Sequence, residues 1–125
     1  MWPWRRPQPL GQKAEDLAAR FLRRAGYKIL ARNLRLSRYE LDIVARQGDT
    51  IAFVEVRSRR APDPVPPEDT VGYTKRRHLT CAANSYRARF PDPDAYYRFD
   101  IVAVVFPEHG KPEITHLVDA FPPEE

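Results

Sequence analysis

The sequence has little cysteine, little lysine and no long apolar run. Its 125 residues include one cysteine, Cys81, so no disulfide can form within the chain. No segment approaches the roughly 20 consecutive apolar residues that a membrane-spanning helix needs. The start of the chain lacks the charged-then-apolar pattern of a signal peptide, and we expect a cytoplasmic protein. These absences argue against disulfide-stabilised secreted domains and membrane-spanning chains.

The charge is unevenly distributed along the chain. Residues 1–60 hold 14 Lys and Arg against 6 Asp and Glu, whereas residues 61–125 hold 7 against 11. Arginine dominates, with 17 Arg against 4 Lys, and the hydrophobic content of 42% suits one globular domain. A basic half with many guanidinium groups favours a polyanionic partner such as nucleic acid. A generally arginine-rich protein without such a partner is the alternative.

Residues 38–60, RYELDIVARQGDTIAFVEVRSRR, have the alternation of two β-strands joined by a tight turn. Gly48-Asp49 suits a two-residue turn with glycine at its first central position. This turn sets Asp42 opposite Glu55, and directly opposed residues on one face lie about 5 Å apart at Cβ. The same pattern sets Glu40 opposite Arg57 and places Tyr39, Leu41, Ile43 and Ala45 on the other face.

Two adjacent carboxylates repel each other unless a cation lies between them. Mg²⁺ or Mn²⁺ suits this place, because each takes oxygen ligands from one or two carboxylates and fills its remaining positions with water and substrate phosphate. A glutamate in the apolar run IAFVEV favours such a metal site, because a buried charge needs a partner. The alternative is a solvated face with a Glu40–Arg57 ion pair.

Residues 11–25 predict a helix, because small and apolar residues recur at i, i+3, i+4 and i+7, and Gly26 follows to end it. Glu15 lies at the edge of the apolar stripe and can face a site made by neighbouring strands. Asp16 points away from the stripe towards solvent. The alternative role for Glu15 is a favourable interaction with the dipole of its own helix.

A second helix is expected from a cap at Thr74 to about Phe90, after a proline-rich loop at residues 58–72 that serves as a lid or as a plain connection. Its first turn is basic, which opposes the helix dipole, and an incoming phosphate would reverse that penalty. Solvated charges are the alternative. The candidate nucleic-acid contacts are Lys75, Arg76 and Arg77 in this turn, and Arg59 and Arg60 at the end of the hairpin.

The remaining strands complete an α/β fold with a mixed central sheet flanked by helices. We expect strands at Tyr27–Arg32, at Tyr96–Phe106, which holds the buried run IVAVV, and at the edge segment Ile114–Val118. The element order is helix, three-stranded meander, helix, strand and edge strand. The expected divisions are a flexible arm at 1–9, a single domain at 10–118 and a fraying tail at 119–125. His78, His109 and His116 show no ligand spacing and receive no chemical role.

The segments GQKAEDLAARFLRRAGYKILARN, ELDIVA, FVEVRSR, TKRRHL and RFDIVAV resemble the bacterial YraN-type family. That family is similar to archaeal Holliday junction resolvases and to the PD-(D/E)xK nuclease superfamily, so the resemblance implies a restriction-endonuclease-like core from about Leu10 to Phe106. It also implies the site residues: Glu15, Asp42 and Glu55 as the metal-binding acids, the backbone carbonyl of Val56 as a further ligand, Glu40 in support, and Arg57 in place of the usual lysine.

Two residues depart from the family pattern. Tyr39 stands where glycine is common, and Arg57 stays protonated at any ordinary pH, so it cannot act as a general base. The resemblance implies a Mg²⁺- or Mn²⁺-dependent endonuclease on DNA, including branched DNA, that works as a homodimer. The loop Pro62–Pro67 and the edge around Tyr96 and Tyr97 are the expected dimer contacts. A nucleic-acid-binding protein without cleavage and a protein-interaction module are the alternatives.

Overall fold

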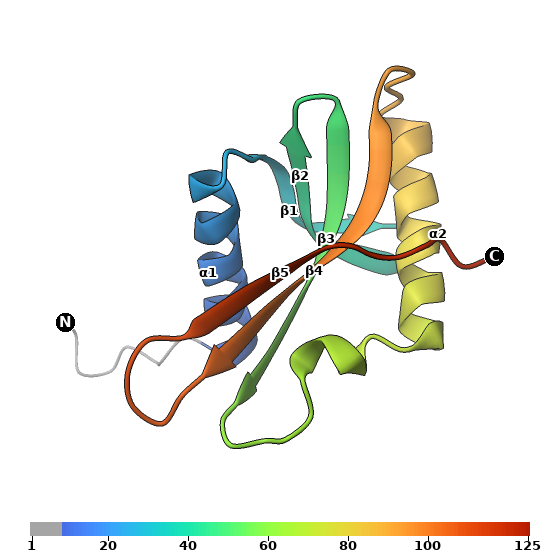
Figure 1. Cartoon of the computed structure of the whole chain (residues 1–125). Helices are drawn as coiled ribbons and strands as arrows, with labels where there is room; N and C mark the ends of the chain where they lie inside the picture. The colour runs from blue at the N-terminus through green and yellow to red at the C-terminus, as the bar shows by residue number, and fades with distance from the viewer. Residues whose placement is uncertain (1–8) are drawn as a thin grey trace, which may run out of the picture.

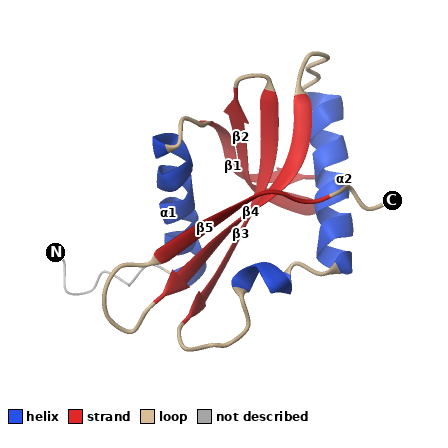
Figure 2. Cartoon of the chain, viewed as in Figure 1, coloured by secondary structure: helices blue, strands red, loops and turns tan. Residues whose placement is uncertain are grey.

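Two helices enclose a five-stranded sheet, one on each face (Figure 1, Figure 2). The structure, a computed structural model, describes residues 9–125, so most of the predicted arm at 1–9 lies outside the described residues. The α/β architecture predicted from the sequence is confirmed. The elements are α1 (Leu10–Arg24), β1 (Lys28–Leu36), β2 (Tyr39–Gln47), β3 (Thr50–Arg60), the short 3₁₀ helix η1 (Pro67–Thr70), α2 (Tyr73–Arg89), β4 (Tyr96–Phe106) and β5 (Glu113–Phe121).

The strands follow one another across the sheet in the order β1-β2-β3-β4-β5. All neighbouring pairs are antiparallel except β3 and β4, which are parallel and are joined through α2. The parallel pair is continuous, from Thr50 beside Tyr96 to Arg60 beside Phe106. No helix within residues 9–125 is long and apolar enough to cross a membrane.

The sheet forks where β2 leaves β3. Their pairing runs from the turn only as far as Ile43 beside Val54, in the register that the Gly48-Asp49 turn predicts. Gly48 has a φ of 62°, a conformation that glycine adopts without a steric penalty. Beyond this point β2 stays paired with β1, whereas β3 continues with β4 (Figure 1). The fork leaves room between two parts of one sheet.

Each face of the sheet has its own apolar core. The α1 face is closed mainly by alanine, which lets the helix approach the strands closely, and the α2 face holds larger aromatic side chains. Of the predicted apolar stripe of the first helix, Ala14, Ala18 and Leu22 are buried and Leu17 and Phe21 partly so, but Ala25 is exposed. Core residues on the α1 face include Ala14, Ala18, Leu22, Ile43, Val54, Val102 and Val104, and those on the α2 face include Val44, Phe53, Leu79, Ala82, Tyr86, Phe99 and Ile101.

The predicted faces of β2 are only partly correct. Ile43 and Ala45 lie on the α1 face, but Leu41 and Tyr39 pack with the α2 core, so the alternation changes phase near Asp42. The physical reason is the fork, because β2 turns away from β3 at this point and its side chains turn with it. A strict period of two holds only while a strand stays in one continuous sheet.

The sequence predicts a fraying tail, but the C-terminal residues make specific contacts with the rest of the fold. β5 extends to Phe121, whose ring stacks on Phe99 with centroids 4.9 Å apart. The amide of Glu124 then donates a hydrogen bond of 3.0 Å to Thr80 on α2. The apolar ring and this polar contact hold the tail on α2. Other boundaries also differ, because β1 runs on to Leu36 and Gly72, not Thr74, caps α2.

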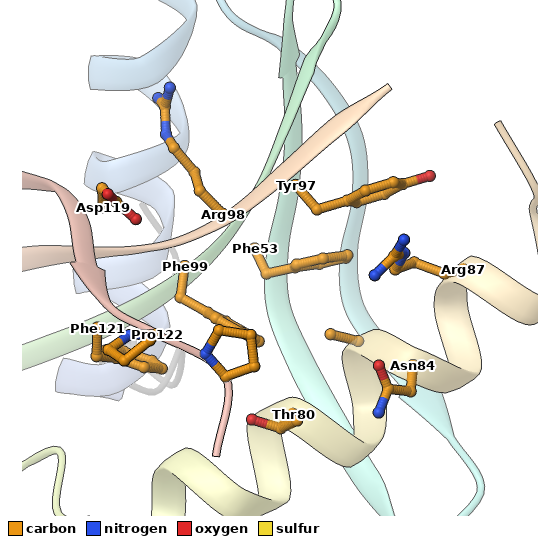
Figure 3. Close-up of a pocket in the computed structure, with 12 residues that line it drawn as sticks. Phe53, Thr80, Asn84, Arg87, Tyr97, Arg98, Phe99, Asp119, Phe121 and Pro122 are labelled. Atoms are coloured by element: carbon orange, nitrogen blue, oxygen red, sulfur yellow. The ribbon is translucent and has the colours of Figure 1, made fainter. Parts of the chain in front are cut away.

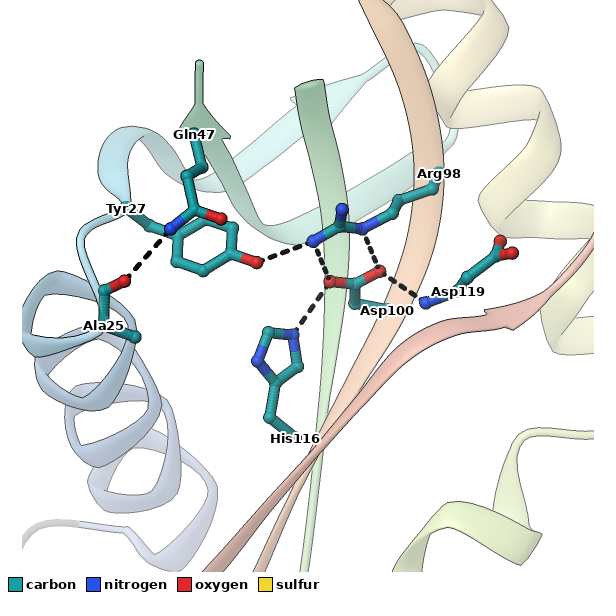
Figure 4. A network of polar contacts seen from close by, with 7 residues as sticks. All are labelled: Ala25, Tyr27, Gln47, Arg98, Asp100, His116 and Asp119. Atoms are coloured by element: carbon teal, nitrogen blue, oxygen red, sulfur yellow. Dashed lines mark hydrogen bonds and ion pairs between the residues drawn. The ribbon is translucent and has the colours of Figure 1, made fainter. Parts of the chain in front are cut away.

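A buried polar cluster joins β4, β5 and the start of β1 (Figure 4). The fully buried carboxylate of Asp100 accepts hydrogen bonds from Arg98 Nε at 2.9 Å and from the Asp119 amide at 3.0 Å, and it lies 2.8 Å from His116 Nε2. Arg98 also donates to the Tyr27 hydroxyl at 2.6 Å. Burial alone would raise the pKa of Asp100, but these partners hold it below its ordinary value of 3.8. His116 therefore has a structural role that its spacing did not reveal.

We predict that Asp100→Asn destabilises the protein by about 3 kcal/mol at pH 7, because it leaves the Arg98 guanidinium partly buried without its counter-ion. Urea unfolding measures the difference. A lowered pKa gives stability that is present above pH 3.8 and is lost as the pH falls through the lower pKa of the folded state, so the variant and wild type should converge in acid. Asp94→Asn, at an exposed position, is the control. Equal stability of Asp100→Asn and wild type at pH 7 would contradict the assignment.

Candidate functional site

The carboxylates of Asp42 and Glu55 meet at the fork of the sheet. Asp42 Oδ2 accepts a hydrogen bond of 2.9 Å from the amide of Val56, which β2 no longer pairs. Glu55 is only 3% exposed, and the neighbouring charge of Asp42 acts on its carboxyl group. The two acids are neighbours, although the backbone pairing that was predicted to set them opposite each other ends one pair earlier, at Ile43 and Val54. Asp42 thus satisfies the open backbone of β3 and brings its charge to Glu55.

Two cations face Glu55 from different elements. Arg57 Nε lies 3.3 Å from Glu55 Oε2, and Lys75 Nζ reaches the same oxygen from α2 at 3.5 Å. Burial and the charge of Asp42 raise the pKa of Glu55 to about 8, although Lys75 and Arg57 act to lower it. Its other oxygen, Oε1, is buried and has no hydrogen-bond donor among the described residues. Among the buried side-chain atoms of the acid pair in residues 9–125, this oxygen is the one left without a partner.

Glu15 lies near the acid pair, but its carboxylate is already engaged. It is buried on α1, where Oε1 accepts hydrogen bonds from Arg32 Nε at 3.1 Å and Asn33 Nδ2 at 2.9 Å. Burial raises the pKa of Glu15 against the effect of Arg32, and the charge of Asp42 adds to the rise. Arg32 also binds Asp16, which was expected to face only solvent. Arg32 and Asn33 were missed from the sequence, because no local pattern ties β1 to α1.

The predicted pairing of Glu40 with Arg57 is wrong. Pairing between β2 and β3 ends before Glu40, which is exposed and lies 4.0 Å from Arg35 on β1. Arg57 instead pairs with Glu55 on its own strand. Glu40 therefore lies outside the site, and the carboxylates of the fork are those of Asp42, Glu55 and, behind them, Glu15.

The predicted basic contacts are divided among several environments. Lys75 is at the carboxylates, but Arg76 is engaged elsewhere, because its guanidinium binds Glu124 at 2.9 Å and the Val71 carbonyl at 3.0 Å. Arg77 is exposed and lies over the Tyr73 ring. Free cationic surface near the site is therefore smaller than the sequence indicated. At the end of β3, Arg59 has a buried Nε without an acceptor and Arg60 is exposed.

The acid pair fits a hard divalent cation better than it fits a closed metal cage. Within residues 9–125 no group of three or more His, Cys, Asp and Glu side chains is arranged to hold a metal. Asp42 and Glu55 nevertheless supply two adjacent carboxylates, and Glu55 Oε1 has no donor of its own. Mg²⁺ and Mn²⁺ accept such a pair because they keep several positions for water and phosphate. Arg32 and Asn33 both bind Oε1 of Glu15, so a role for Glu15 as a third ligand would fall to its other oxygen.

A separate pocket of about 210 Å³ lies on the flank of α2 that faces β4 and β5 (Figure 3). Its walls are mostly aromatic rings and prolines, and neither Asp42 nor Glu55 lines it. The acid pair and this pocket are therefore different places on the α2 face. The lining includes Phe53, Tyr97, Phe99, Phe121, Pro122 and Pro123, with Asn84 and Arg87 at the helix.

Comparison with known proteins places the whole fork inside one family region. Residues 14–104 match the model of the Uncharacterised protein family UPF0102. A UPF0102 protein of Geotalea uraniireducens is 42% identical over 112 residues, which cover 90% of this chain and 88% of the relative. The UPF0102 protein of Nocardia farcinica is 43% identical over 114 residues, which cover 91% of this chain and 90% of the relative. That of Chlorobaculum tepidum is 39% identical over 120 residues, which cover 92% of this chain and 93% of the relative.

We predict that Glu55→Gln stabilises the metal-free protein at high pH. The folded-state pKa of Glu55 is raised from 4.5 to about 8, so stability falls as the pH rises through that range, and glutamine escapes this loss. The gain should reach several kcal/mol at pH 9, since a pKa change of one is worth about 1.4 kcal/mol. Urea unfolding in chelator at pH 5 and pH 9 measures it, with Glu40→Gln as the exposed control. A variant that gains nothing between the two pH values would show that Glu55 is not under electrostatic strain.

Proposed function

For this chain, which belongs to the uncharacterised protein family UPF0102, we propose a function from the residues of the site. That function is a Mg²⁺- or Mn²⁺-dependent endonuclease, which hydrolyses phosphodiester bonds in DNA, including branched DNA. The carrying observation is the half-buried Asp42 beside the buried Glu55, with Glu55 Oε1 lacking a donor. Two carboxylates repel a phosphate, so they serve phosphate chemistry only with a cation between them. The basic residues around the fork support a polyanionic substrate.

Asp42 and Glu55 would hold the cation, with the Val56 carbonyl as a further oxygen ligand. A bound divalent ion supplies Lewis-acid polarisation of the scissile phosphate and of the attacking water. Lys75 and Arg57 would then bind the phosphate oxygens in place of Glu55, since both side chains lie within 4 Å of that carboxylate. Neither has to move far, because the phosphate would occupy the space beside Glu55.

Arg57 favours one second function, a nucleic-acid-binding protein that does not cleave. A guanidinium cannot accept a proton at ordinary pH, so Arg57 can orient water or stabilise charge on the pentavalent phosphorus but cannot act as a base. In the metal-free protein it also neutralises Glu55 at 3.3 Å. A fold that bound DNA through Lys75 and Arg57 without hydrolysis would keep the same contacts.

The proposal predicts that Asp42→Asn and Glu55→Gln each lower Mn²⁺ affinity by at least about tenfold, because each removes one of two charged ligands at nearly constant volume. Isothermal titration calorimetry measures binding. Duplex, single-stranded, flap and four-way DNA with Mg²⁺ or Mn²⁺ then report cleavage. Glu40→Gln is the matched control, since Glu40 lies on the same strand as Asp42 but is exposed and outside the site.

Each pattern of results selects one function. Mn²⁺ binding that depends on both acids, together with DNA cleavage, supports the nuclease. DNA binding without cleavage by the wild type in either metal selects the non-catalytic function. Unchanged Mn²⁺ affinity in Asp42→Asn would remove the metal site and the nuclease with it.

A homodimer is the assembly we propose for branched substrates, because symmetric incision of a four-way junction needs two centres related by a two-fold axis. The expected contacts at Pro62–Pro67 and at Tyr96 cannot form one patch. Arg60 pairs with Phe106 and Thr50 with Tyr96, so these segments lie at opposite ends of the parallel strands, about 30 Å apart. A dimer would therefore use one end, or would set the loop of one protomer against the Tyr96 end of the other.

We predict a protein mass near twice 14.5 kDa by sedimentation equilibrium at micromolar concentration. Val65→Asp and Tyr96→Asp place a charge on an exposed apolar residue at each end, where the side chains are 50% and 68% exposed. One of them should return the protein to a monomer, because a charge buried in an interface has no partner. A wild-type monomer that does not pair on four-way DNA would contradict paired incision.

A further inference from the structure

A small aromatic depression lies on the flank of α2 that faces β2, close to the acid pair. Its volume is about 170 Å³, and it is lined by Tyr39, Tyr73, Thr74, Arg77, His78 and Cys81. We propose that this depression stacks an unpaired base of the DNA strand whose phosphate lies at Asp42 and Glu55. The inference rests on the proposed function for the place of the phosphate, and it adds the substrate class: DNA with an unpaired nucleotide beside the bond.

The rings of the depression are arranged for stacking. Tyr39 and His78 stack with centroids 4.2 Å apart and an interplanar angle of 16°. Tyr73 is 52% exposed, and the guanidinium of Arg77 lies 5.8 Å from its ring centroid. Such aromatic and guanidinium surfaces bind bases of any sequence, at about 1–3 kcal/mol for each stacked base. In a duplex the faces of the bases are covered by their neighbours, so only an unpaired base can use these rings.

The depression and the acid pair are tied together through two elements. Tyr39 precedes Asp42 by three residues on β2, which corresponds to about 10 Å along a strand. His78 follows Lys75 by one turn of α2, and Lys75 reaches Glu55 at 3.5 Å. A strand with its phosphate at the fork therefore passes the depression within a few nucleotides.

The chemistry of the lining selects a nucleotide over an apolar partner. No carboxylate lines this depression, and Arg77 supplies a cation beside the rings. A second guanidinium, that of Arg38, lies 6.0 Å from the Tyr39 ring. The pocket on the other flank of α2 also combines rings with arginines, but its lining includes the carboxylate of Asp119 (Figure 3). Flat rings with cations and without acids match a base attached to a phosphate backbone.

Cys81 allows a direct test, because it lines the depression and is the only cysteine in the chain. It is exposed, so a neutral maleimide should modify it at a measurable rate. In Mg²⁺, a saturating single-stranded oligonucleotide with a non-hydrolysable backbone should slow that reaction by about fivefold or more, as one stacked base is worth at least about 1 kcal/mol. A blunt duplex of the same length and concentration should slow it by less than about twofold.

Matched variants separate stacking from general DNA binding. Tyr39→Leu and Tyr73→Leu keep apolar volume but remove the ring, and each should abolish most of the protection of Cys81. Phe90→Leu, which changes a 46% exposed ring at the C-terminal end of α2, far from the depression along the helix, should leave protection unchanged. Circular dichroism checks that each variant is folded, and because the two ring variants are independent, the test needs only one of them.

The outcomes distinguish this inference from the proposed function. Equal protection by duplex and single strand, or full protection in both ring variants, would overturn the base-binding depression. Ring-dependent protection in a protein that binds no Mn²⁺ would keep the depression and remove the nuclease. Metal-dependent cleavage with Cys81 unprotected would do the reverse.

Discussion

The hydrogen bond between Asp42 and the Val56 amide is the contact on which the site depends. β2 and β3 are held together by backbone pairs up to Ile43 and Val54, and beyond them each strand belongs to a different part of the sheet. The carboxylate of Asp42 replaces the missing backbone acceptor at 2.9 Å. A side chain that closes a gap in the sheet is held rigidly, because its partner belongs to the backbone. Rigidity of this kind is what a phosphate-cleaving site requires of its metal ligands.

The same contact brings charge into a buried place at a cost. Asp42 lies beside the buried acid Glu55, and the cations Arg57 and Lys75 form ion pairs with Glu55. These cations only partly offset burial, which is why the pKa of Glu55 stays near 8. The Asp100 cluster shows the opposite solution, in which every oxygen is paired and the carboxylate stays ionised. Both oxygens of Asp100 have hydrogen-bond partners, whereas Oε1 of Glu55 has none among the described residues.

Local patterns predicted the frame of the molecule well. The Gly48-Asp49 turn sets the hairpin register, and the apolar run of β4 marks a strand covered on both faces. What could not be predicted depends on contacts between distant segments. The face of Leu41 follows from the fork, and the hydrogen bonds from Arg32 to Glu15 and Asp16 follow from how β1 crosses α1. No spacing in the sequence encodes these contacts, because each joins two elements through packing.

The arrangement of the strands also implies an order of folding. The three strands β1, β2 and β3 form a meander of local contacts, whereas β3 meets β4 only after the chain has passed through α2. Local pairings close small loops and form fast, and parallel pairings between distant segments form late. The two acids of the fork thus come together on the hairpin before Lys75 arrives on α2. Until α2 packs on the sheet, the acid pair stands open to solvent and to cations.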